Sequence, residues 1–354
     1  MTRRFDRIFA FRPVDTLFFR SGRPFNQSDP GAAEAESLFP PNPPTLVGAV
    51  RNALAQALEG PRGGRWSETT AGLLNGGHLR FGAPFLVLNG ERLYPAPAAL
   101  LRLEDEKLAR ARPGEVIETD LGPTCLPEVP ETSKMVTDAW LTARGMTCFL
   151  EGQVPAEGDL RLTACLWKSE PRIGIGRDVA TRRVEEGALY APVHIRPAEG
   201  LEICVRVQAT DPQVAARLAG LDGLPGTVAL GGEHRAAGLR DLAPDRITEA
   251  TEPQGAGAVV VATGPVIAKP ALLTPGGPLV RGGGRIRMVC ARKPGMIGGW
   301  DDQGRRPHPM RPVLTAGTTW FLDGATGTLG PLGPRHRWGF GDCLSGILHD
   351  DKAS

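Results

Sequence analysis

A proline run that leads into one apolar stripe is the feature of this sequence that most constrains its local structure. The segment Pro40-Pro41-Asn42-Pro43-Pro44 predicts a stiff, extended, polyproline-like entry, and the hydroxyl of Thr45 is expected to cap the helix that follows. Apolar residues then recur at helical spacing until Gly60, namely Leu46, Val50, Ala53, Leu54, Ala57 and Leu58. The segment therefore predicts an amphipathic helix that buries this stripe.

The other face of this helix and the loop before it carry polar groups. Gly48, Arg51, Asn52 and Gln56 lie opposite the stripe, and Arg20 and Arg23 sit on a Gly/Pro turn between aromatic residues. The free amides of a helix N-terminus beside such a loop suit a phosphate group. A capped helix with solvated arginines is the plainer interpretation, and the residues of this segment leave it open.

The sequence contains 46 glycines and 33 prolines, which favours many turns and short strands over long helices. Strands are expected at 79–81, 85–88 and 92–94, with Asn89-Gly90 as a hairpin turn, and at 146–150, 189–195, 201–209, 227–230, 258–262 and 316–322. A Gly-rich connection is expected at 61–77, and a short helix capped by Asp211 at 211–218.

Two successive patterns of strand, helix and strand predict an α+β fold of two tandem ferredoxin-like (RRM-like) modules with long loop insertions. The first module is expected to span residues 1–165, with an acidic insertion near 104–131. The second is expected to span 166–354 and to end in the glycine-rich loop at 339–346.

The charge is segregated along the chain although the net charge is only +2. Basic residues gather in the first 25 residues and at 281–311, where Lys293 and Arg311 lie, whereas the acidic residues gather at 104–131. Such segregation is what a basic groove on a nearly neutral protein looks like, and a solvated face is the alternative for any single run.

Several classes of protein are not indicated. The six cysteines are scattered without a CxxC motif, so neither a zinc site nor a disulfide framework is expected. There is no long apolar run and no signal-peptide core, so we expect a cytoplasmic protein without a membrane segment. The motifs of metalloproteases, nucleotide-binding P-loops and serine hydrolases are missing, and no metal or cofactor is expected.

Two further glycine segments carry arginines. Gly174 and Gly176 flank a hairpin with Arg177, Thr181, Arg182 and Arg183, and no third glycine makes it a dinucleotide motif. Gly231 and Gly232 end the strand at 227–230 and precede Arg235. Paired glycines let a backbone approach another strand or a phosphate closely.

Four stretches taken in order resemble a known family, subunit three of the Cmr effector complex of type III-B CRISPR-Cas systems. The members of this family are RAMP proteins. They are 15–25 with 39–51, then 174–190, then 230–235, and finally 316–321 with the loop 339–346. The first stretch is the most specific of the four. The match spans nearly the whole chain, except that the acidic segment 104–131 does not align.

The resemblance implies a non-catalytic, guide-RNA-binding subunit that grips the 5′ repeat-derived handle and docks on the large signature subunit and on the adjacent backbone RAMP subunit. It makes these residues candidates for handle contacts: Arg20, Arg23, Gly48, Arg51, Gly176, Arg177, Thr181, Arg182, Arg183, Gly231, Gly232 and Arg235. Lys293 and Arg311 are added from charge alone. Aromatic residues make up only 6% of the chain, so loops rather than a stacking sheet face are expected to bind RNA.

Two other functions stay open from the sequence. A metal-independent RAMP-superfamily endoribonuclease that processes guide RNA would need a general acid or base, for which His336 lies near the glycine loop, with His78, His194 and His234 elsewhere. A protein-binding scaffold whose basic face meets an acidic partner is the third interpretation.

Overall fold

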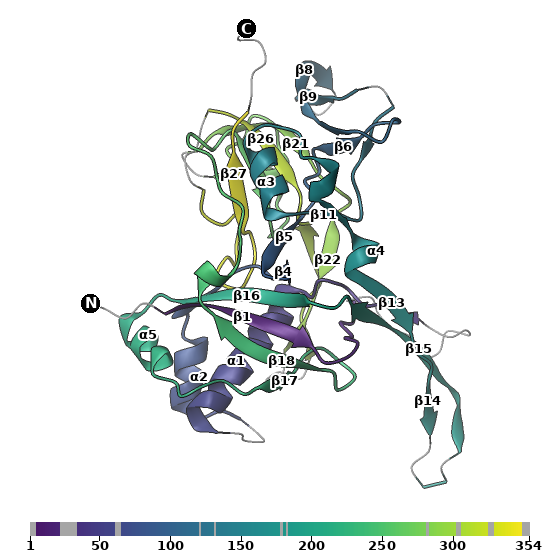
Figure 1. Cartoon of the computed structure of the whole chain (residues 1–354), viewed down its shortest axis with the longest axis vertical. Coiled ribbons are helices and arrows are strands. Elements are labelled where there is room, and N and C mark those ends of the chain that lie inside the picture. Colours follow the sequence, from purple (N-terminus) through teal and green to yellow (C-terminus); the bar gives the residue numbers. More distant parts are fainter. Residues whose placement is uncertain are drawn as a thin grey trace.

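The computed structural model describes residues 5–21, 34–60, 65–119, 122–130, 132–177, 180–181, 183–280, 283–301, 306–324 and 329–348. The chain is an α+β protein of many short strands and few helices, as the sequence predicts. Figure 1 shows a lower unit of sheet and helices, an upper unit around β26 and β27, and two projecting arms.

A nine-stranded sheet with β1 in the lower unit reaches the upper unit through β5, β11 and β12 (Figure 1). Its order is β12-β11-β5-β4-β16-β1-β18-β17, and β3 also pairs with β16. The strands are β1 (Asp6–Pro13), β3 (Leu79–Phe81), β4 (Phe85–Leu88), β5 (Glu91–Pro95), β11 (Ala139–Leu141), β12 (Leu160–Leu162), β16 (Leu201–Ala209), β17 (Thr227–Ala229) and β18 (Ala236–Leu242). The Asn89-Gly90 hairpin is confirmed, since both residues have positive φ (51° and 86°), as a tight turn of this kind requires.

Strands from both sides of residue 165 build this sheet. β1 lies between β16 and β18, with Phe9 opposite Val205 on one side and Asp241 on the other. The chain leaves the sheet after β5, adds β11 and β12 at its edge, and returns at β16. The predicted modules 1–165 and 166–354 therefore share one sheet.

Three helices pack on one side of this sheet, α1 (Pro43–Glu59), α2 (Glu68–Asn75) and α5 (Pro212–Ala219). Most of the predicted stripe of α1 is buried: Leu46, Val50 and Leu54 pack in one core with Phe9, whereas Ala57 and Leu58 are half-buried. The predicted start of this helix was wrong. Asn42 is the N-cap residue and prolines fill the first helical positions, so Thr45 lies inside the helix.

Two more local expectations can be compared with the structure. Asp211 caps α5 as predicted, because its carboxylate accepts hydrogen bonds from Gln213 N and Val214 N at 2.8 and 3.0 Å. The connection at 61–77 contains α2, which the sequence analysis missed. Its N-cap Ser67 accepts a hydrogen bond from Thr70 N at 3.2 Å.

The upper unit contains a sheet of order β21-β26-β19-β27 and a smaller sheet of order β20-β25-β22. Their strands are β19 (Val259–Ala262), β20 (Val266–Ile267), β21 (Arg285–Cys290), β22 (Gly295–Ile297), β25 (Arg311–Leu314), β26 (Thr319–Asp323) and β27 (Cys343–Gly346). The strand expected at 146–150 was wrong. These residues belong to α3 (Ala143–Leu150), capped by Thr142, which buries Met146, Phe149 and Leu150.

Two arms project from this body (Figure 1). One is made by β13 (Trp167–Pro171), β14 (Gly174–Arg177) and β15 (Val184–Pro197), with β2 (Glu34–Ala35) paired to β15. The other arm is the hairpin of β8 (Arg112–Thr119) and β9 (Gly122–Glu128), beside the sheet of β6 (Leu100–Arg102), β7 (Leu108–Arg110) and β10 (Lys134–Met135). The remaining elements are β23 (Trp300–Asp301), β24 (Arg306–Pro307), α4 (Thr163–Leu166) and the 3-10 turns Glu157–Asp159, Pro244–Arg246 and Pro270–Leu272.

The C-terminal glycine loop is a buried joint between the two units. Gly339 N donates to Phe81 O at 3.1 Å, and Gly341 N donates to Pro265 O at 2.9 Å. Both glycines have φ near +80°, and a Cβ on Gly341 would collide with the carbonyl of Leu332. Glycine is required here because the backbone packs against backbone.

Candidate nucleic-acid interface

The loop after β1 is held between two other segments of the chain. Leu17 and Ile195 of β15 exchange two backbone hydrogen bonds of 2.8 Å, and Gly232 N donates to Phe18 O at 2.8 Å. Gly231 has φ of +84°, and a Cβ there would collide with Phe18 O. The predicted close approach at Gly231 and Gly232 is therefore to a strand-like loop of the protein itself.

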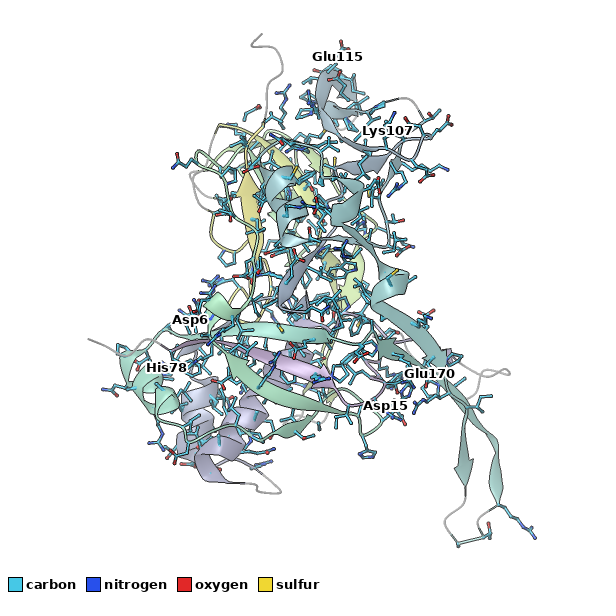
Figure 2. The ribbon with its side chains drawn as sticks, viewed as in Figure 1. Asp6, Asp15, His78, Lys107, Glu115 and Glu170 are labelled. Carbon is cyan, nitrogen blue, oxygen red and sulfur yellow. The ribbon has the colours of Figure 1, made fainter. Side chains whose placement is uncertain are left out.

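An ion-pair network lies on top of this joint. Asp15 is within 3.2 Å of Arg172, 3.1 Å of Arg196 and 3.5 Å of Arg235. Glu170 also pairs with Arg172, at 2.8 Å, and with Arg196. Figure 2 shows Asp15 and Glu170 close together at the base of the β13–β15 arm. We call these five residues the Asp15 network.

The network shifts the acidity of its carboxylates. Partial burial of Asp15 acts to raise its pKa, but the amide of Thr16 and the guanidiniums of Arg172 and Arg196 lower it overall. Hydrogen bonds from Arg196 and Arg172 lower the pKa of Glu170. Both carboxylates are therefore held in the charged form that orients the arginines.

A buried histidine lies beneath the network. The His194 ring is 1% exposed, lies 3.1 Å through Nδ1 from the Thr16 hydroxyl and stacks on Phe18 with ring centroids 5.4 Å apart. Burial, followed by the nearby charges of Arg235 and Arg172, lowers its pKa. His194 is therefore a neutral packing residue of this joint at pH 7.

Arg20 lies at the edge of the same joint. Its backbone pairs with that of Ser37 in an isolated antiparallel β-bridge, and the neighbouring Ser21 N donates to Glu36 O at 3.0 Å. Arg20 itself is exposed. Of the predicted handle residues, the structure thus brings together Arg20, Gly231, Gly232 and Arg235, whereas Arg23 lies outside the described residues.

The predicted hairpin residues lie farther out along the β14–β15 arm. Gly176 and Arg177 are the last residues of β14, and Ile175 pairs with Leu189 of β15. Thr181 and Arg183 are exposed near the turn, where the Thr181 hydroxyl accepts from Arg183 N at 3.4 Å. Arg182 lies outside the described residues.

Arg51 and Gly48 lie on α1, away from the Asp15 network. The Arg51 guanidinium carbon is 5.4 Å from the Trp66 ring centroid and 5.3 Å from that of Trp338. Burial lowers the pKa of Arg51. Gly48 is exposed, and no atom lies within 4 Å of where its Cβ would be.

The two candidates chosen from charge alone are on the upper unit. Lys293 is exposed between β21 and β22, and Arg311 is exposed at the start of β25. The neighbouring Arg292 is turned inward and donates to Ala96 O and Val136 O at 2.8 and 2.9 Å. One basic run of the sequence therefore contains both solvent-exposed and buried cations.

Sequence reasoning missed the residues that hold the surface together. Asp15, Glu170, Arg172 and Arg196 join positions up to 181 apart in the chain. The charges at every second residue from Lys168 to Arg172 were the available signal, since Lys168 and Glu170 pair with Arg196 and His194 across the ladder. Nothing local indicates Asp15 as their shared partner.

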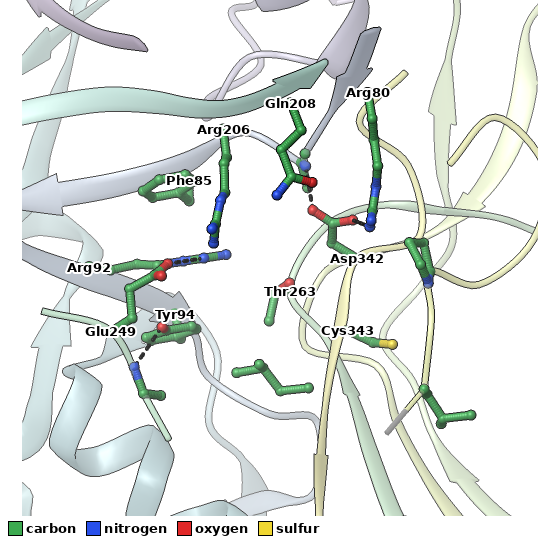
Figure 3. Close-up of a pocket in the computed structure, with 16 residues that line it drawn as sticks. Arg80, Phe85, Arg92, Tyr94, Arg206, Gln208, Glu249, Thr263, Asp342 and Cys343 are labelled. Carbon is green, nitrogen blue, oxygen red and sulfur yellow. Dashed lines mark hydrogen bonds and ion pairs between the residues drawn. The ribbon is translucent and has the colours of Figure 1, made fainter. Parts of the chain in front are cut away.

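A second polar cluster lines a cavity of about 320 Å³ between the two units (Figure 3). Arg92 Nη1 lies 2.6 Å from Glu249 Oε1, and Arg206 is held by two hydrogen bonds to Asp6 at 2.8 and 2.7 Å. Asp342, next to the glycine loop, accepts from Ala83 N at 2.7 Å, and burial raises its pKa. The contact of Asp342 with Ala83 links the two units, whereas Arg206 and Asp6 join neighbouring strands of one sheet.

The described residues contain no group of three or more His, Cys, Asp and Glu that could hold a metal ion. Within the same residues, no helix is long and apolar enough to cross a membrane.

Chains of CRISPR complexes are among the solved structures that match this chain. One is a chain of the type III-B Cmr-beta complex bound to cognate target RNA and AMPPnP, with a TM-score of 0.50 and 17% identity, covering 89% of this chain and 86% of that one. A chain of the Csm3-Csm4 subcomplex of a type III-A interference complex has a TM-score of 0.42 and 11% identity, covering 90% and 94%. At such identity the first likeness concerns the fold alone.

Among curated proteins no sequence matches. The sequence profile of the family described as "CRISPR-associated protein (Cas_Cmr3)" matches residues 9–348, which is nearly the whole chain. This match spans all four stretches from which the resemblance was inferred and confirms it. The chain belongs to the Cas_Cmr3 family of CRISPR-associated proteins.

Proposed function

We propose that this chain is a non-catalytic RNA-binding subunit of a cytoplasmic type III-B CRISPR effector ribonucleoprotein, and that it grips the 5′ repeat-derived handle of the guide RNA. Its family membership supports a place in such a complex. The surface around the Asp15 network and Arg20 is the region best suited to the RNA.

The observation that carries this proposal is the convergence of guanidinium groups from three distant segments. Arg172 and Arg196 come from the β13–β15 arm and Arg235 from the turn after β17, and all three pair with Asp15. A guanidinium has five N–H donors, and the carboxylates of the network engage only some of them. The remaining donors are oriented before any phosphate arrives, which reduces the entropy lost on binding.

We also propose that the two units are tandem ferredoxin-like modules. The first consists of β1, α1 and β4, continued after the long insertion by β16, α5 and β18. The four strands lie side by side in the order β4-β16-β1-β18, which fits a split βαβ arrangement. In this view, the chain docks on the large signature subunit and on the adjacent backbone subunit.

The experiment that tests RNA binding compares a guide that carries the 5′ handle with the same guide whose handle is scrambled. Wild-type protein is expected to retain the first guide more tightly. Arg20→Gln and Arg235→Gln are each expected to weaken that retention by about tenfold. Each should also reduce the slope of log affinity against log salt by about 0.7 for every phosphate that the variant no longer neutralises.

Lys107→Gln is the matched control, because Lys107 is an exposed cation at the far end of the molecule (Figure 2). Its affinity for the guide should equal that of the wild type. Equal retention of the two guides by the wild type, or a fall in thermal stability of the Arg20 and Arg235 variants without a change in RNA affinity, contradicts the proposal.

The non-catalytic part of the proposal is tested with the same labelled guide. His194 is buried and supports the loop, which favours a structural role for it, while His336 is exposed. We expect the guide to stay intact during prolonged incubation with the wild type. Cleavage that His336→Ala abolishes would establish an endoribonuclease instead.

A further inference from the structure

The hairpin of β8 and β9 exposes an unusual share of the apolar side chains of this protein. Twelve large hydrophobic side chains are exposed among the described residues, and four of them lie in or next to this hairpin: Val116, Ile117, Leu126 and Val129. We call residues 112–119 and 122–129 the β8–β9 arm. Contiguous exposed apolar groups on a projecting element are typical of a protein contact site.

The arm has an inward face and an outward face. Cys125 is 6% exposed and packs in the core of the upper unit with Met288 and Phe321. Ile117 lies opposite Thr124 in the ladder, and side chains alternate along a strand, so Leu126 lies on the same face as Ile117. Ile117 and Leu126 are 38% and 47% exposed, and we call their side the outward face. Val116 pairs with Cys125 on the other face but is itself 61% exposed, so only the Cys125 end of that face is buried.

The base of the arm is fixed to the body. Arg110, just before β8, lies with its guanidinium carbon 4.6 Å from the ring centroid of Phe149 and 5.9 Å from that of Phe321. Cys125 Sγ lies 3.3 Å from Gly114 O across the hairpin. An arm held in this way presents its outward face in one orientation, which lowers the entropy lost when a partner binds.

The charges of the β8–β9 arm indicate which kind of surface can bind it. It carries Glu115, Glu118 and Glu128 against the single cation Arg112, and the three glutamates are exposed. No ion pair of the described residues involves any of the three glutamates. Glu115 lies within β8, at the end of the molecule opposite the Asp15 network (Figure 2).

We propose that the β8–β9 arm is a docking element for another protein, whose surface has an apolar depression bordered by lysines and arginines. The acidic arm repels phosphates, so RNA is disfavoured as its occupant. A second copy of this chain is disfavoured too, because an isologous contact through the arm would bring like charges together. This inference rests on the proposed function, from which the candidate partners are the other protein subunits of the effector complex.

The test measures binding of the full chain to each of those subunits, purified singly, without RNA. We expect one subunit to bind the wild type with an affinity that falls as salt rises. Ile117→Ser with Leu126→Ser should weaken that binding by about tenfold or more. Glu115→Lys with Glu118→Lys should weaken it as well and should reverse the salt dependence, because the arm then carries a net positive charge toward the basic border of the partner.

Two controls separate docking from other effects. Leu162→Ser removes an equally exposed apolar side chain elsewhere (54% exposed), and Glu199→Lys reverses an exposed charge outside the arm; neither should change the affinity. Thermal unfolding shows whether the serine variant folds, and the lysine variant provides an independent result if it does not.

Three outcomes overturn the proposal: no subunit binds, the arm variants bind as tightly as the wild type, or sedimentation shows that the arm mediates self-association instead. A fall in handle-RNA affinity of the arm variants would assign the arm to RNA and overturn it as well. Loss of handle recognition by the wild type together with arm-dependent docking would defeat the proposed function alone.

Discussion

Arginines occupy two contrasting regions of this molecule. Around Asp15, the side chains of Arg172, Arg196 and Arg235 pair with carboxylates and remain 33%, 49% and 24% exposed. Between and within the two units, other arginines are removed from water and lie against rings or carbonyl oxygens.

The second group differs in its partners as well as in its burial. Arg92 lies 4.2 Å from the ring centroid of Phe85 and pairs with Glu249. Arg110 has aromatic rings on its guanidinium, and burial lowers its pKa to about 10. Arg292 donates to two carbonyl oxygens. Arg292 belongs to the basic stretch 281–311, so an arginine of such a stretch can be a structural linker here rather than a candidate for RNA.

The two groups should differ in how much each contributes to the free energy of unfolding. A buried charge with its partner removed leaves an uncompensated ion, which is costly. An exposed pair contributes little to stability because water and salt screen it. Stability and RNA affinity should therefore respond to different sets of arginines.

The largest effect is expected for Arg92→Ala. The substitution leaves Glu249 without its cation and removes packing from Phe85 and Tyr94, so the free energy of unfolding should fall by about 3–5 kcal/mol. Denaturant titration measures this fall. Arg196→Ala is the exposed counterpart, and its cost should be about 0–1 kcal/mol. Equal costs for the two variants would erase the distinction between the two regions.

Arg51→Ala should have an intermediate effect and decides to which region Arg51 belongs. Its guanidinium lies between Trp66 and Trp338, and removal of these two cation–π interactions should lower the free energy of unfolding by about 1–3 kcal/mol. Handle-RNA affinity of the folded variant is measured in parallel. Unchanged affinity places Arg51 with the structural arginines, whereas a marked loss moves this predicted handle residue to the binding group.

The smallest expected effect is the pH dependence of stability caused by His194, which lies beneath the Asp15 network. It is tested with His194→Asn. Burial holds the pKa of His194 below its ordinary value of 6.5. Below pH 6.5 the unfolded state therefore binds more protons than the folded state, and this residue makes stability fall as the pH falls. The asparagine variant removes that dependence and keeps a polar partner for Thr16.

Melting temperatures of the wild type and the His194→Asn variant, followed from pH 8 to pH 5, measure this difference. The wild type should lose more stability than the variant between pH 7 and pH 5. Parallel curves would mean that the Asp15 network accommodates a charged imidazole at no cost.

Local sequence signals predicted much of the fold. The stripe of α1, the strand β16, the Asn89-Gly90 turn and the Asp211 cap were all readable because each depends on neighbouring residues. The strand expected at 146–150 was wrong because a short apolar run fits both the helical and the strand period. The signal for a helix was Thr142, whose hydroxyl accepts a hydrogen bond from Gly145 N at the helix start.

The architecture and the site depended on pairings that no local pattern encodes. β1 pairs with β16 and β18, about 200 residues away, so the division of the chain near residue 165 could not be judged from composition. The family resemblance made Arg20 and Arg235 candidates, but it did not indicate Asp15, which pairs with Arg235. The glycines of the C-terminal loop were noticed, yet only the contacts of Gly341 show that they serve a joint.

That joint has a consequence for biosynthesis. Gly339 is bonded to Phe81 in one unit, and β27 a few residues later pairs with β19 in the other. Residues 339–346 are synthesised after the strands they join, so until then the nascent chain displays an open β19 edge and an unsealed junction. Such an edge is a template for wrong pairing. We therefore expect the newly made polypeptide to depend on chaperones until residues 339–346 are in place.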